Sequence, residues 1–308
     1  MKASEIFSQP SVVACQGIRG ANSETACRYM FQQPDIMFME SFSAVFTAVE
    51  SGLCQYGVLP IENSTHGSVT AVYDLMSKHK FSIVRAVKVS ISHSLLALPS
   101  SKLSDIKEII SHEQAIGQCS EFLKDHRGIK ITACQNTALA AKLVCESGRN
   151  DLAAICSPDC VEIYNLKSLA HNIQDAENNC TRFICIRKTP ISYNGADKIS
   201  LMLSLPNRPN SLYEILSEFA KLNINLTKIE SRPIIGTDFE FLFYIDFDAS
   251  LADPKISALM DNLGKKLSVF TVLGNYSTVQ PKAGYDLTSR KQLATLIFTS
   301  LEPPAASR

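Results

Sequence analysis

The chain has 308 residues, and its 30 Lys plus Arg balance its 30 Asp plus Glu, so the formal net charge is zero. Apolar residues make up 45% and charged residues 19%, a composition that can bury a substantial core and argues against disorder. The absence of a basic run argues against a nucleic-acid partner, and no stretch approaches the roughly 18 apolar residues of a membrane span. We therefore expect a cytoplasmic protein of two or three compact units.

Ten cysteines are scattered along the sequence, many of them inside apolar runs. They form no C-x-x-C pair, and no histidine stands at zinc-finger spacing from them. This distribution predicts reduced, buried thiols, and we expect neither a metal nor a cofactor.

Residues 11 to 188 alternate short apolar runs with amphipathic segments, which is typical of an α/β fold with crossover helices. In the first part we predict strands at 11–15, 36–40, 56–61 and 81–90 and helices at 24–31 and 42–53. Ser23 is placed to cap the first of these helices.

The segment 93–98 is expected to cross into a second lobe that extends over about residues 93–168. There the pattern predicts strands at 106–110, 129–134 and 152–156 and helices at 113–124 and 137–145. A late strand at 182–187 has its partners far back in the sequence, so it should return to the first lobe. Two crossings would leave a cleft between the lobes, where small ligands commonly bind.

Residues 189–197 contain Pro190, Asn194 and Gly195 with little apolar content, and we place a domain boundary there. Beyond it the predicted order is β-α-β-β-α-β, which is typical of a ferredoxin-like unit with both helices on one face of an antiparallel sheet. Its expected elements are 198–205, 211–222, 224–229, 239–247, 255–267 and 269–273, within a domain at 198–277. The tail at 278–308 contains a predicted amphipathic helix over 287–301.

Four polar clusters lie at the ends of predicted strands, where open α/β sheets bind their ligands. Each cluster alone can be explained by turn residues, but four in the same topological position favour a site. The clusters are Gln16-Gly17-Ile18-Arg19-Gly20, Glu62-Asn63-Ser64-Thr65-His66-Gly67, Ser111-His112-Glu113-Gln114-Ala115 and Asn179-Cys180-Thr181-Arg182-Phe183.

In order and spacing these clusters resemble the prephenate dehydratase family over about residues 12–275. The strings that carry the resemblance are Gly57 to Ser64 with Gly67, Ser111 to Cys119, and Ile173-Gln174-Asp175 leading to the last cluster. Glu230-Ser231-Arg232-Pro233 resembles the ESRP motif of the ACT regulatory domain. The resemblance implies a two-lobed catalytic domain at 11–188, of the type II periplasmic-binding-protein-like fold, followed by an ACT domain at 198–277.

The activity implied by the resemblance is the decarboxylative dehydration of prephenate to phenylpyruvate in L-phenylalanine biosynthesis. Thr181 would contact the leaving oxygen, and Arg182 would hold a substrate carboxylate with two parallel hydrogen bonds. Glu62 would either act as an acid, which needs a raised pKa, or orient neighbouring residues or Arg182. The other implied substrate-binding residues are Gly20, Ala21, Asn63, Ser64, Ser111, His112, Gln114, Asn179 and Phe183. For His66 and His112 we favour a structural or binding role over proton transfer, and His112 is placed to cap its helix.

The resemblance also implies that L-phenylalanine inhibits the enzyme through the ACT domain in a homodimer or homotetramer. The amino acid would bind where the loop at 206–212 meets the ESRP strand at a subunit interface. The implied contacts are Asn210, Ser211, Leu212, Glu230, Ser231, Arg232 and Pro233. Where the family typically has Gly-Ala-Leu, this chain has Asn210-Ser211-Leu212.

Other functions are less consistent with the sequence. A dinucleotide-binding oxidoreductase would need the full G-x-G-x-x-G, which the loop from Gly17 to Gly20 lacks. A non-catalytic amino-acid sensor or solute-binding protein would not need Thr181-Arg182-Phe183. Arogenate is the alternative substrate, and prephenate is preferred because it is the more frequent substrate in the family.

Overall fold

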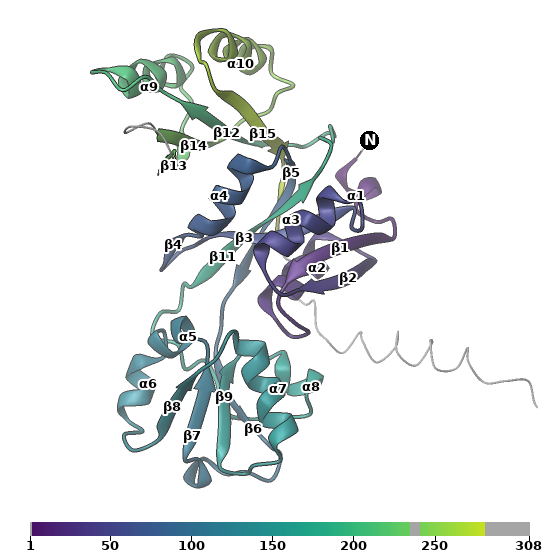
Figure 1. The fold of residues 1–308 in the computed structure, drawn as a ribbon, viewed down its shortest axis with the longest axis vertical. Helices are drawn as coiled ribbons and strands as arrows, with labels where there is room; N and C mark the ends of the chain where they lie inside the picture. Colours follow the sequence, from purple (N-terminus) through teal and green to yellow (C-terminus); the bar gives the residue numbers. More distant parts are fainter. Residues whose placement is uncertain (1, 235–240, 281–308) are drawn as a thin grey trace, which may run out of the picture.

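The structure is a computed structural model that describes residues 2–234 and 241–280. The described chain forms three sheets, which belong to a first lobe, a second lobe and a C-terminal unit. The first lobe lies in the middle, with the second lobe at one end of the molecule and the C-terminal unit at the other (Figure 1). The helix predicted at 287–301 lies outside the described residues.

The sheet of the first lobe has the strand order β16-β5-β11-β3-β1-β2, with β4 paired to β3. β1 is parallel to β2 and β3, and β11 lies antiparallel between β3 and β5, so the late strand returns to the first lobe as predicted. The strands are β1 (Ser11–Gln16), β2 (Pro34–Met39), β3 (Tyr56–Asn63), β4 (Gly67–Ser68), β5 (Ser82–Ser90), β11 (Cys180–Arg187) and β16 (Thr278–Val279).

The helices that cover this sheet are α1 (Ala3–Ile6), α2 (Asn22–Met30), α3 (Phe42–Glu50) and α4 (Thr70–Lys78). The predicted cap of α2 is wrong, because Ser23 lies inside the helix and its N-cap is Ala21. The amide of Gly20 donates to the Glu24 carboxylate at 2.7 Å instead, and this bond closes the turn before the helix.

The second lobe has a sheet of order β10-β6-β9-β7-β8. The helix predicted at 113–124 is two helices, and the carboxylate of Asp175 marks the start of the second by accepting bonds from Ser120 and Glu121. The elements are β6 (Ser94–Ala97), η1 (Leu103–Asp105), β7 (Glu108–Ser111), α5 (Glu113–Gly117), α6 (Ser120–Lys124), β8 (Lys130–Ala133), α7 (Thr137–Ser147), β9 (Leu152–Cys156), α8 (Cys160–Ile163) and β10 (Lys167–Ala170).

The C-terminal unit has the predicted β-α-β-β-α-β order, and its antiparallel sheet runs β13-β14-β12-β15. Asp253 caps the second helix by accepting the Lys255 amide at 2.9 Å, as expected from the Asp-Pro pair. The elements are β12 (Lys198–Ser204), α9 (Ser211–Lys221), β13 (Leu226–Pro233), β14 (Phe241–Asp248), α10 (Pro254–Lys266) and β15 (Phe270–Tyr276).

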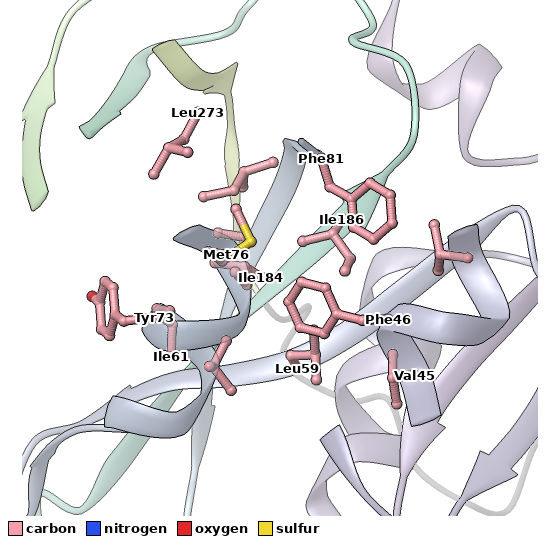
Figure 2. Close-up of a cluster of buried hydrophobic side chains, with 14 of the residues drawn as sticks. Val45, Phe46, Leu59, Ile61, Tyr73, Met76, Phe81, Ile184, Ile186 and Leu273 are labelled. Atoms are coloured by element: carbon pink, nitrogen blue, oxygen red, sulfur yellow. The ribbon is translucent and has the colours of Figure 1, made fainter. Parts of the chain in front are cut away.

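The C-terminal unit shares a hydrophobic core with the first lobe. Figure 2 shows Met76 of α4, Ile184 of β11 and Leu273 of β15 in this cluster. β15 passes so close to β5 that a Cβ at Gly274 would lie 2.1 Å from the carbonyl oxygen of Ile83. The chain then adds β16 to the first-lobe sheet, parallel to β5. The unit is therefore firmly docked on the side of the first lobe away from the second lobe.

All ten cysteines are unpaired thiols, and seven of them are buried as predicted. For the other three the predicted burial is wrong, because Cys134 and Cys180 are partly exposed and Cys145 is exposed. Within residues 2–234 and 241–280, none of the helices has the length and apolar character needed to cross a bilayer.

Candidate active site

A cavity of about 410 Å³ lies between the two lobes, where β1 and β3 of the first lobe end and β11 begins, opposite α5 and α7 of the second lobe. Seven of the residues lining it belong to the predicted clusters or site, and the others come mainly from helix starts and the crossing between the lobes. The lining residues are Gln16, Ala21, Asn22, Ser23, Phe42, Pro60, Asn63, Ile91, His93, His112, Gln114, Ala115, Gln118, Gln135, Asn136, Thr137 and Thr181.

Asn63 and Thr181 form a hydrogen-bonded pair in the wall of this cavity. They face each other because Asn63 is opposite Thr181 in the register of β3 and β11. Asn63 Nδ2 donates to Thr181 Oγ1 at 3.0 Å, while Asn63 Oδ1 accepts from Thr65 and His66. These acceptor bonds fix the orientation of the amide. The hydroxyl of Thr181 accepts from Asn63, so its own proton can be donated into the cavity.

Two predicted substrate contacts instead support this pair from behind the cavity lining. Asn179 is buried, and its Oδ1 accepts from Asn63 Nδ2 at 2.7 Å. Ser64 Oγ donates to the carbonyl of Asn178 at 3.0 Å and accepts the Cys180 amide at 2.9 Å. These bonds hold the loop before β11 against the turn that follows β3.

Residues of the second lobe complete the opposite wall. His112 caps α5, as expected, by accepting the Gln114 amide at 3.2 Å. Gln118 lies 3.1 Å from His66 Nδ1 through its Nε2 and 2.8 Å from His93 Nε2 through its Oε1. Gln118 therefore links the second lobe to a loop of the first lobe and to the crossing segment.

His93 is a cavity residue that the sequence reasoning missed. It is 3% exposed and lies between β5 and β6, where the chain passes from one lobe to the other. Burial lowers the pKa of His93, and the hydrogen bond to Gln118 opposes this effect only in part. The ring is therefore neutral near pH 7, with its proton on Nε2 because Gln118 Oε1 is the acceptor there. A histidine in a crossing segment carries no local motif that would have singled it out.

The described part of the chain lines this cavity without any Asp, Glu, Lys or Arg side chain. The first residues of α2 and α7 reach it, and Asn136 caps α7 by accepting the Leu139 amide at 2.8 Å. Free amides at helix N-termini attract anions. The cavity thus suits a carboxylate ligand held by neutral donors.

Arg182 lies outside the cavity, so the prediction that it holds a substrate carboxylate is wrong. Neighbouring residues of a strand point to opposite faces of a sheet, and Thr181 takes the cavity side of β11. Arg182 is 5% exposed beneath the C-terminal unit, where it contacts Glu62 Oε1 at 2.7 Å and Asp246 Oδ2 at 2.6 Å.

Glu62 also faces the C-terminal unit. Burial acts to raise its pKa, but Arg182 and Lys228 outweigh that effect, so the pKa of Glu62 lies below its usual value. An ionised carboxylate turned away from the cavity cannot serve as the acid, and that expectation is wrong. The alternative expectation, an ion pair with Arg182, is what the structure contains.

Three other predicted contacts are packing residues. Ser111 is fully buried and donates to the Ile155 carbonyl at 2.6 Å. Phe183 lies in the core of the first lobe. Gly20 has a left-handed φ of 90°, and a Cβ there would lie 3.0 Å from Cys160 Sγ. Their position near the site shapes its walls, but a direct substrate contact is wrong for Ser111 and Phe183.

The loop predicted to bind an amino acid borders a second cavity, of about 490 Å³, in the C-terminal unit. Asn210 has a φ of 68°, a left-handed conformation that Gly and Asn adopt most readily. Ser211 donates to the carbonyls of Pro206 and Arg208 and lines the cavity, while Leu212 packs on the core of the unit.

The ESRP strand is divided between two environments. Glu230 accepts from Ser68 at 2.7 Å, and Arg232 forms an ion pair with Asp74 at 3.0 Å, so both contact the first lobe. Ser231 and Pro233 point the other way and are exposed. Within one chain the strand and the loop at 206–212 therefore do not share the second cavity.

Comparison with known proteins places the chain in a family. The family model described as prephenate dehydratase matches residues 13–191. Arogenate dehydratase/prephenate dehydratase 1, chloroplastic, of Arabidopsis thaliana is 40% identical over 280 residues, which cover 86% of this chain and 71% of that protein. Arogenate dehydratase 2 of Petunia hybrida is 39% identical over 281 residues, with the same coverage of both. The chain belongs to the prephenate dehydratase family.

Solved structures share this architecture over most of its length. The prephenate dehydratase of Arthrobacter aurescens in complex with L-Phe has a TM-score of 0.78 and 27% identity, covering 95% of this chain and 100% of that chain. GqqA, described as a novel type of quorum quenching acylase, has a TM-score of 0.79 and 28% identity, covering 87% of this chain and 98% of that chain. The expected cytoplasmic location stays a prediction, since several relatives are named as chloroplastic proteins.

Proposed function

We propose that this protein converts prephenate to phenylpyruvate, CO2 and water, with Thr181 as its catalytic residue. The observation that supports this most directly is the Asn63–Thr181 pair in the wall of the interlobe cavity. The family match over residues 13–191 includes both residues.

The reaction needs help at its leaving oxygen. The bond between the ring and its carboxylate breaks, and its electron pair enters the ring as CO2 departs. The ring then expels the hydroxyl at the opposite carbon and becomes aromatic. Thr181 donates a hydrogen bond to that oxygen as negative charge builds on it. Threonine is a weak acid, so solvent supplies the net proton that completes the water molecule.

Neutral donors suit a substrate that loses a carboxylate in the reaction. A cation paired with the departing carboxylate would stabilise the ground state more than the transition state, where that charge is being lost. Gln16, Gln114 and Gln135, with the helix starts at Asn22 and Thr137, can orient both carboxylates without such a penalty.

Prephenate is the substrate that this cavity favours over arogenate. Arogenate carries an ammonium group in place of the keto oxygen, and the described cavity residues offer no carboxylate to pair with it. The test is to measure kcat/KM for both substrates with one preparation and to identify the products. We expect phenylpyruvate from prephenate at the higher kcat/KM. A preference for arogenate would contradict the substrate assignment, and turnover of neither would refute the dehydratase.

We also propose that the C-terminal unit is an ACT-type regulatory domain that binds L-phenylalanine in a homodimer or homotetramer. The Arthrobacter relative, solved with L-Phe, aligns with 95% of this chain, which supports the proposal. Asn210 keeps the left-handed backbone that glycine would provide, so the loop can retain its shape. Inhibition by L-phenylalanine, together with a dimeric or tetrameric mass in sedimentation, is the expected result. A monomer insensitive to millimolar L-phenylalanine would contradict it.

A further inference from the structure

A buried network of charges joins the strands of the active-site pair to the sheet of the C-terminal unit. We infer that Glu62 and Arg182 are positioning residues, which hold Asn63 and Thr181 in their reactive geometry and are themselves held by Asp246 and Lys228. This inference rests on the proposed function, because it assigns the catalytic step to Thr181.

Each charged residue is a direct sequence neighbour of one residue of the active-site pair. Glu62 precedes Asn63 at the end of β3, and Arg182 follows Thr181 at the start of β11. Glu62 is opposite Arg182 in the same register that places Asn63 opposite Thr181, and the register shifts just after Arg182. The two pairs occupy opposite faces of the sheet. A displacement of the charged pair must therefore move the backbone that carries the catalytic pair.

The first anchor is Asp246 of β14. Its Oδ2 lies 2.6 Å from Arg182 Nη2, and its Oδ1 accepts from Ser200 at 2.6 Å. Ser200 is in turn 2.7 Å from the hydroxyl of Tyr276. Arg182 and Asp246 are each 5% exposed. Loss of Asp246 would leave the buried guanidinium paired with Glu62 alone, and loss of Arg182 would leave the buried carboxylate of Asp246 without this cation. The main effect of such a buried pair is to hold β11, which carries Arg182, in a fixed position relative to β14.

The second anchor is Lys228 of β13. Its Nζ lies 2.7 Å from Glu62 Oε2 and donates to Ser68 Oγ at 2.8 Å. Ser68 donates in turn to Glu230, the first residue of the ESRP string. Glu62 is thus shared between a cation of its own lobe and a cation of the C-terminal unit. A shift of β14 would be transmitted to Thr181 through Asp246 and Arg182, and a shift of β13 would be transmitted to Asn63 through Lys228 and Glu62.

A second interdomain ion pair provides a matched control. Arg232 of β13 contacts Asp74 of α4 at 3.0 Å. This pair also docks the C-terminal unit on the first lobe, but Asp74 lies on a helix and neither residue is part of β3 or β11. If docking alone mattered, its loss would have the same effect as loss of the Arg182–Asp246 pair.

The test uses the full-length protein with Asp246→Asn and Asp74→Asn. Because small misplacements of catalytic groups are costly, Asp246→Asn should lower kcat by about 10- to 100-fold while the KM for prephenate changes far less. Asp74→Asn should leave kcat within about twofold of wild type. Asp246→Glu, which keeps the charge, should recover part of the loss. A folded Asp246→Asn variant with wild-type kcat, or equal losses in both variants, would overturn the inference.

Amide hydrogen exchange gives a readout that does not need turnover. Asp246→Asn should speed exchange of the backbone amides at 61–63 and 180–183, and Asp74→Asn should not. If the wild type turns over neither substrate, the dehydratase proposal fails while the exchange pattern still decides the coupling. Should Asp246→Asn not fold, Lys228→Gln is the second variant, with the same local increase expected. Unchanged exchange in these two segments would refute the coupling.

Discussion

The direction of the Thr181 hydroxyl depends on a single side chain. Asn63 can only donate to Thr181, because its oxygen already accepts bonds from Thr65 and His66. The proton of Thr181 is then free for the substrate. The direction of this hydrogen bond decides whether Thr181 can donate to a leaving group or only contributes to the cavity wall.

Replacing Asn63 by aspartate should abolish the hydrogen bond that Asn63 donates to Thr181, with almost no change in side-chain shape. A carboxylate would accept the Thr181 proton instead of donating to it, so kcat should fall by about 100-fold or more. The measurement is the steady-state rate of phenylpyruvate formation, with Asn150→Asp in the second lobe as control. Asn150 accepts a hydrogen bond from Ser100 far from the cavity, and its variant should retain wild-type activity. A Asn63→Asp enzyme of normal kcat would show that Thr181 does not donate.

The residues of the site were only partly predictable. The resemblance assigns the Thr-Arg-Phe and Glu-Asn-Ser strings to the site as whole motifs, but a strand presents only alternate residues to one face. Thr181 and Asn63 therefore line the cavity, while Arg182 and Glu62 face the C-terminal unit. Phe183 is instead buried in the hydrophobic core of the first lobe. His93 and Gln118 needed the fold, because each reaches the cavity through its position between the lobes.

At the scale of elements, α6 depends on an acid from a distant part of the chain. Asp175 accepts from the amides of Ser120 and Glu121 and from the Ser120 hydroxyl, and so fixes the start of this short helix. The sequence pattern 113–124 predicted one helix, since its apolar spacing continues through the break. What the pattern could not show was the carboxylate that arrives from residue 175.

Asp175→Asn should lower the free energy of unfolding by about 1 kcal/mol near neutral pH, the usual value of a helix cap. Burial acts to raise the pKa of Asp175, but the bonds from Ser120 and Glu121 outweigh it and the pKa lies below its usual value. Its contribution is therefore complete above the unfolded pKa and declines as the pH falls below about 4. Urea unfolding across this range should show the two proteins converging in acid. A constant difference at all pH values would contradict the assignment.

The crossing of β15 over β5 has no room for a side chain at Gly274. Gly274→Ala should destabilise the protein by about 1–3 kcal/mol, because its methyl group would collide with the Ile83 carbonyl. Gly264→Ala in α10 is the matched control, where the added carbon would meet Phe270 at an ordinary 3.4 Å. There the better helix propensity of alanine should stabilise by up to about 1 kcal/mol. Thermal unfolding of both variants decides, and a stable Gly274→Ala protein would mean that the two strands are not in contact.

The larger elements followed from periodicity. The alternation of strands and helices in both lobes and the β-α-β-β-α-β order were predictable, because each element buries one apolar face. α4 was missed, since its apolar residues form a narrow stripe at Val72, Tyr73 and Met76. Part of its partner surface, Tyr244, comes from the C-terminal unit, and its hydroxyl donates to the Tyr73 carbonyl.

At the scale of the molecule, the first lobe is contacted on two sides. The second lobe closes the cavity through Gln118 and the starts of α5 and α7, and the C-terminal unit holds the opposite face of β3 and β11 through Asp246 and Lys228. β3, which ends at Asn63, and β11, which begins next to Thr181, lie between these two sets of contacts. The chemistry proposed for the cavity and the ligand binding proposed for the C-terminal unit would thus act on the same strands.

The most direct measurement is the turnover of prephenate by the wild type, Thr181→Ser and Thr181→Val, followed through phenylpyruvate formation. Thr181→Ser keeps the hydroxyl and should retain kcat within about tenfold. Thr181→Val keeps the shape but has no proton to donate, so its kcat should fall by about 100-fold or more with little change in KM. A valine variant as fast as the wild type would contradict the central role given to the Thr181 hydroxyl.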